Sequence, residues 1–148
     1  MALSYYRDLL HMAVCDMAKC SGKLSDRLLI AWQGYLYKFH WDEFEAMLMP
    51  EDLPVFRKLK KCMSDDLHRN IEEQRREVFE QTRDGPRPLT DFQISKFANA
   101  ETVIRAMHGK SAKKAIEAIV EMYSVAVQTV DFERIVRTSH PKKGIRDE

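Results

Sequence analysis

The chain has 148 residues, of which 45% are hydrophobic and 32% are charged, and its formal net charge is +1. This length suits one domain with a real core, and the composition is too apolar for a disordered chain. The net charge is close to zero, so the molecule as a whole has no electrostatic field that would attract nucleic acid or an anionic membrane. Local clusters of charge therefore say more about binding than the net charge does.

Several features favour a soluble helical protein. The N-terminus lacks the basic region and apolar core of a secretion signal, and no run approaches the about 18 apolar residues of a membrane span. The five glycines are few for the tight turns of a strand-rich fold. The three cysteines, Cys15, Cys20 and Cys62, are an odd number and predict reduced thiols rather than a disulfide framework. We predict a cytoplasmic, compact all-α bundle of five to seven helices, with residues 1–140 in a single domain.

Two apolar stripes whose members are three or four residues apart indicate helices near the two ends of the chain. The first consists of Leu3, Tyr6, Leu10, Ala13, Met17 and Cys20. It predicts a helix over 3–20 that ends at Gly22, a residue that adopts the left-handed conformation easily. Ser25 is expected to cap the next helix, over 26–39. That helix is apolar around most of its circumference, which predicts the most buried element of the fold.

Residues 41–48 predict a short helix, and residues 53–81 predict either one long helix or two helices joined near Ser64. Beyond Ser64 the apolar stripe narrows between charged side chains. A helix of this kind either lies on the surface or pairs with another chain, and we favour the surface. The exposed seam expected to contact a protein partner or a second copy of the chain comprises Leu67, Ile71, Val78 and Phe79.

The segment Gly85–Pro88 is the clearest break in the chain, because proline and glycine do not continue a helix. It predicts a hinge between subdomains 1–83 and 90–138. Thr90, followed three residues later by Gln93, fits a reciprocal capping box that opens a new helix, interrupted near Asn99.

The second apolar stripe predicts a long helix that Ser111 is expected to cap. Its members are Ala112, Ile116, Ile119, Tyr123, Ala126 and Val130. Beyond this helix, residues 141–148 read as a flexible basic tail.

Residues 90–115 resemble a helix-turn-helix module, in which the second helix enters the major groove and flanking cations hold phosphates. The cations that would contact nucleic acid are Arg105, Lys110, Lys113 and Lys114. The resemblance implies a transcription regulator. The glycine usual in the turn is missing, and Asn99 would replace it.

Two further patterns imply chemistry. Arg134 and His140, separated by five residues, resemble the arginine and histidine pair of the HEPN-family ribonucleases. The resemblance implies that the histidine acts as acid or base while the arginine holds a phosphate. His11 and Cys15, four residues apart on one helix, could both reach one metal ion, with Cys62 as a third ligand.

None of these patterns has the full motif of an enzyme or of a metal or cofactor site. We therefore expect a non-enzymatic adaptor or regulatory protein without a cofactor, which binds a protein partner through a helical surface. DNA binding through residues 90–115 is the alternative, and a HEPN-like ribonuclease is the second alternative. Self-association as a homodimer is compatible with the first expectation.

Overall fold

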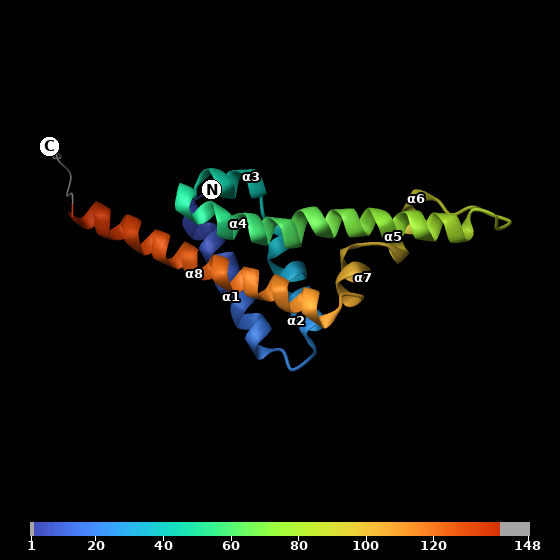
Figure 1. Ribbon diagram of the computed structural model, residues 1–148, viewed down its shortest axis with the longest axis horizontal. Coiled ribbons are helices and arrows are strands. Elements are labelled where there is room, and N and C mark those ends of the chain that lie inside the picture. Colours follow the sequence, from blue (N-terminus) through green and yellow to red (C-terminus); the bar gives the residue numbers. More distant parts are fainter. Residues whose placement is uncertain (1, 140–148) are drawn as a thin grey trace.

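The computed structural model describes the backbone of residues 2–139 and the side chains of residues 2–129. The described chain contains no strand, which confirms the predicted all-α fold. The α-helices are α1 (Leu3–Lys19), α2 (Leu24–Gly34), α3 (Trp41–Ala46), α4 (Leu53–Lys60), α5 (Asp66–Thr82), α6 (Asp91–Phe97), α7 (Ala100–Arg105) and α8 (Gly109–Ser139) (Figure 1). Two short 3-10 helices, η1 (Leu36–Lys38) and η2 (Pro50–Asp52), lie before α3 and α4 respectively.

Helices α4 and α5 form one continuous rod, because a π-helical turn, η3 (Lys61–Asp65), joins them without a break. Ser64, near which the sequence predicted a possible junction of two helices, lies in this turn and is buried. A π-helical turn widens the helix locally but keeps its backbone hydrogen-bonded. When the rod is counted once, the described part of the chain has seven helices, within the predicted range.

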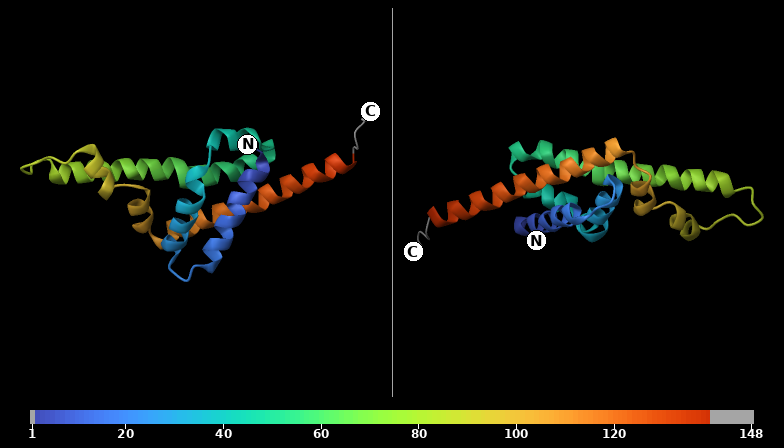
Figure 2. Two further views of the ribbon diagram at one scale, coloured as in Figure 1. Left: turned by 180° about the vertical axis from the view of Figure 1, so that it is seen from behind. Right: turned by 90° about the horizontal axis from the view of Figure 1, so that it is seen from below.

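The bundle forms where the rod crosses the helices from the two ends of the chain. Helix α1 packs against α2 and α8, and α4 packs against α8. Figures 1 and 2 show α5 projecting from this bundle, with α6 folded back beside its far end and α7 returning to the bundle. Helix α8 extends past the bundle on the other side. No helix in the described part of the chain is long and apolar enough to cross a membrane.

One hydrophobic core holds the bundle together, and both predicted terminal stripes contribute to it. From the first stripe Leu3, Tyr6, Leu10, Ala13 and Met17 are buried, and from the second Ala112, Ile119 and Ala126 are buried. The core includes residues from both sides of the break at Gly85–Pro88, such as Leu67 and Ile104. The two predicted subdomains therefore share a single core.

Stacked and edge-to-face rings pack α1 against α3 and α4. The rings of Tyr6 and Phe44 stack with centroids 4.6 Å apart, and Phe56 meets Phe44 edge-on at 5.5 Å. The Tyr6 hydroxyl donates a hydrogen bond to the Glu43 carboxylate. Burial, and then the Glu43 carboxylate, raise the pKa of Tyr6 above its ordinary value, so the phenol stays protonated and keeps this bond.

Two of the predicted helix starts are confirmed. Thr90 and Gln93 form the reciprocal capping box, with Gln93 N–H donating to Thr90 Oγ1 at 3.2 Å and Thr90 N–H donating to Gln93 Oε1 at 2.9 Å. The interruption near Asn99 is also present, because Asn99 caps α7 by accepting from Thr102 N–H at 3.0 Å. Each cap satisfies backbone donors that the first helical turn leaves free.

Several predicted caps are wrong. Helix α1 ends at Lys19 with Cys20 as its C-cap residue, within one residue of the predicted end, but Gly22 lacks the positive φ of a left-handed cap. Gly22 instead lies against Asp26, whose Oδ2 would be 2.7 Å from a Cβ at position 22. Asp26 accepts from Lys23 N–H at 3.3 Å, so α2 begins at Leu24, two residues before the predicted start, and Ser25 is buried inside the helix. Ser111 likewise lies inside α8, which begins at Gly109.

Candidate protein-binding groove

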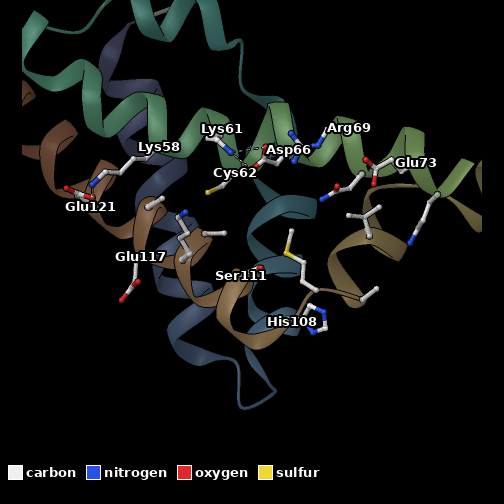
Figure 3. Close-up of a pocket in the computed structure, with 18 of the residues that line it drawn as sticks. Lys58, Lys61, Cys62, Asp66, Arg69, Glu73, His108, Ser111, Glu117 and Glu121 are labelled. Atoms are coloured by element: carbon white, nitrogen blue, oxygen red, sulfur yellow. Dashed lines mark hydrogen bonds and ion pairs between the residues drawn. The ribbon is translucent and has the colours of Figure 1, made fainter. Parts of the chain in front are cut away.

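A groove of about 1090 Å³ separates the rod from α7 and the first half of α8 (Figure 3). Its buried lining side chains, Val103, Ala115 and Ala118, are apolar, and its half-buried ones are the apolar Cys62 and Met107 and the polar Asp66, Asn70 and Gln74. Val103, Ala115 and Ala118 are buried in the core, and Cys62 and Met107 pack against it. The groove therefore has an apolar base where its buried lining residues belong to the core of the bundle.

Ion pairs along the groove order part of its rim. Lys58 Nζ lies 3.6 Å from Glu121 Oε1, which connects the rod to α8 at one end. Asp66 pairs with Lys61 at 3.0 Å and with Arg69 at 3.1 Å, both on the rod. Except for Asp66, which is 25% exposed, these side chains are largely exposed, and exposed pairs each contribute only about 0–1 kcal/mol to stability.

The remaining charged groups of the groove are mainly acidic. Glu73 and Glu77 on the rod and Glu117 on α8 have no ion-pair partner in the described part of the chain, and neither has Lys114. The described lining as a whole has five carboxylates and four lysine or arginine side chains. Three carboxylates are thus available to a ligand, against one ammonium group.

Cys62 lies in the base of this groove and is a poor nucleophile there. Burial raises the pKa of its thiol, and the nearby Lys114 ammonium only partly opposes that effect. The thiol is therefore protonated near neutral pH and behaves as a small apolar surface.

The cations predicted to contact nucleic acid lie close together in the fold but differ in their partners. Arg105 Nε, in α7, pairs with Glu101 Oε2 at 2.9 Å. Lys110, Lys113 and Lys114 lie in the first turns of α8, are exposed, and have no ion pair in the part that the structure describes. Helix α7, which would enter the major groove, has only six residues, and its Val103 and Ile104 are buried.

The predicted exposed seam on α5 needs correction at its start. Leu67 is fully buried and Ile71 packs against the core, so neither is available to a partner. Val78 is half-buried and Phe79 is 46% exposed, and for these two residues contact with a protein partner or a second copy stays a prediction. The sequence did not single out Phe92 and Phe97 in α6, which are 71% and 61% exposed.

The residues of the ribonuclease interpretation are outside the described part. The backbone of Arg134 belongs to α8, but its side chain and the whole of His140 lie outside the described residues. The basic tail predicted at 141–148 lies outside them as well.

No protein-family model matches the chain, and no curated protein or solved structure matches it significantly.

Proposed function

We propose that this chain is a non-enzymatic cytoplasmic adaptor or regulatory protein that binds an amphipathic helix of a protein partner in the groove between the rod and helices α7 and α8. The observation that carries the proposal is the combination of an apolar base with an excess of rim carboxylates that have no ion pair among the described residues. Amphipathic helices bind grooves of this kind by placing one apolar face on the base.

The charge of the rim selects the chemistry of the partner. Among the described residues of the lining, the charged groups without an ion pair are three carboxylates, those of Glu73, Glu77 and Glu117 on the two walls, and one cation, Lys114. Opposite charges across an interface accelerate association and select among partners, whereas like charges oppose binding. The helix that fits this groove therefore has an apolar stripe flanked by lysine or arginine.

A designed peptide tests this proposal. The peptide has leucines at helical spacing flanked by lysines, and its matched partner has glutamates in place of the lysines. We expect the basic peptide to bind in fluorescence anisotropy and the acidic one not to bind. The triple variant Glu73→Lys, Glu77→Lys, Glu117→Lys should weaken binding of the basic peptide roughly tenfold, because each exposed charge pair is worth a few tenths of a kcal/mol to about 1 kcal/mol.

The control for the triple variant is Glu72→Lys, because Glu72 is exposed on the same helix and does not line the groove. It should leave the affinity nearly unchanged. Equal binding of the basic and acidic peptides, or an equal loss with Glu72→Lys, would contradict the assignment of the groove. So would the absence of binding by either peptide.

DNA binding is a second candidate, favoured by the exposed lysines at the start of α8, for which the described side chains supply no ion-pair partner. Phosphate contacts release counterions, so the logarithm of the affinity for duplex DNA should fall linearly with the logarithm of salt concentration. The double variant Lys110→Ala, Lys113→Ala should reduce that slope by about 0.9 for each phosphate that the protein no longer neutralises. An affinity that does not depend on salt, or an unchanged slope in the variant, would dismiss this candidate.

A further inference from the structure

A thiol, an imidazole and a phenol meet where α1 packs against α8, away from the groove. His11 and Cys15 are one turn apart on α1, and Cys15 Sγ lies 3.6 Å from His11 Nε2. On the other side of the ring, His11 Nδ1 lies 2.8 Å from the hydroxyl of Tyr123 on α8. None of the three residues lines the groove.

Both neutral tautomers of the imidazole satisfy the two contacts, and one of them makes His11 a base for the thiol. With the proton on Nδ1, the ring donates to the Tyr123 oxygen, and Nε2 is free to accept the Cys15 S–H. Tyr123 belongs to a different helix and thus fixes the ring plane, so that Nε2 stays directed at the sulfur. A nucleophile in contact with a base, which a third group orients, is the arrangement that activates cysteine in many enzymes.

The other two thiols lack such a base among the described residues. Cys20 Sγ accepts a hydrogen bond from Gly22 N–H at 3.4 Å, and burial raises the pKa of Cys62. Cys15 is half-buried beside an exposed His11, so a small molecule can reach the sulfur. The three cysteines are therefore in three different environments within one protein.

We infer that Cys15 is a modification site that undergoes thiol–disulfide exchange with small disulfides, with His11 as the base. The Cys15 proton moves to His11 Nε2 as the sulfur attacks one sulfur of the disulfide. A new S–S bond forms between Cys15 and that sulfur, the original S–S bond breaks, and the departing thiolate takes the proton from the imidazolium. The products are a mixed disulfide on Cys15 and one free small thiol, and no other oxidant is needed.

The test measures the modification rate of each cysteine in the full-length protein by mass spectrometry of its peptides. The probe is hydroxyethyl disulfide, which is neutral. A charged probe would have its reaction rate altered by the Asp16 carboxylate, which follows Cys15 in α1 and accepts a hydrogen bond from Tyr35. We expect Cys15 to react faster than Cys20 and Cys62. His11→Asn should slow Cys15 by at least about tenfold, because a positioned base contributes about 10²–10⁴-fold to a rate.

The matched control is His68→Asn, at an exposed histidine in α5 that has no hydrogen bond to a cysteine in the described part of the chain. It should leave all three rates unchanged. In His11→Asn an unchanged rate at Cys62 shows that the core is intact. If that variant is unfolded, Tyr123→Phe takes its place, because it removes the hydroxyl that orients the ring. Tyr123→Phe should slow Cys15 by a smaller factor. A Cys15 that reacts no faster than Cys20, or whose rate is the same in the folded variant, overturns the inference.

Discussion

Replacing Phe44 with alanine should lower the free energy of unfolding by about 3–5 kcal/mol, the cost of removing a buried phenylalanine ring. Phe44 is fully buried, and its ring stacks on Tyr6 and meets Phe56 and Phe39 edge-on. These neighbours belong to α1, η1 and α4 and their flanking residues, so the cavity would open where three separate segments meet. Chemical denaturation followed by the helical circular dichroism signal measures the change.

The matched control for Phe44→Ala is Phe92→Ala, because Phe92 is 71% exposed in α6 and contributes nothing to the core. Surface substitutions of this kind usually change stability by less than about 0.5 kcal/mol. A similar loss of stability in both variants would mean that the aromatic cluster around Phe44 does not hold α3 on the bundle.

The helices could be predicted from the sequence because their apolar spacing is a local property. Leu10 and Ile119 each belong to an apolar stripe with helical spacing, and both are buried, as the spacing predicts. Helix ends were less predictable, because several nearby polar groups compete for the same free backbone donors. At the start of α2 the Asp26 carboxylate accepts the Lys23 N–H, and Ser25, an equally good cap by residue type, is inside the helix.

The groove could not be predicted from the sequence, because its walls come from distant parts of the chain. Cys62 and Ala115 share its base, and the Lys58–Glu121 pair closes one end. Only the packing of α4 on α8 and of α7 on α5 brings these residues together. The sequence shows which residues are apolar or charged, but it does not show which of them meet in space.

The predicted exposed seam on α5 was wrong at Leu67 and Ile71 for a related reason. The same reason predicts a large loss of stability when Leu67 is truncated. The stripe along the rod is fully buried at Phe56, Leu59, Met63 and Leu67, and it becomes half-buried at Ile71 and Val78 as α5 leaves the bundle (Figure 1). Leu67→Ala should therefore lower the free energy of unfolding by about 2–5 kcal/mol, as expected for a buried leucine. From their spacing alone, Leu67 and Phe79 were both assigned to the exposed seam. Where burial along α5 ends depends on how far the bundle extends, which the spacing does not show.

The comparison with Phe79→Ala makes the Leu67 prediction specific. Phe79 lies on the same helix and is 46% exposed, so its removal should cost far less than that of Leu67 under the same denaturation conditions. If α5 instead used its whole stripe to pair with a second chain, both variants would lower the mass seen in sedimentation. The two substitutions would then destabilise a dimer to similar extents, and the stability difference between them would disappear.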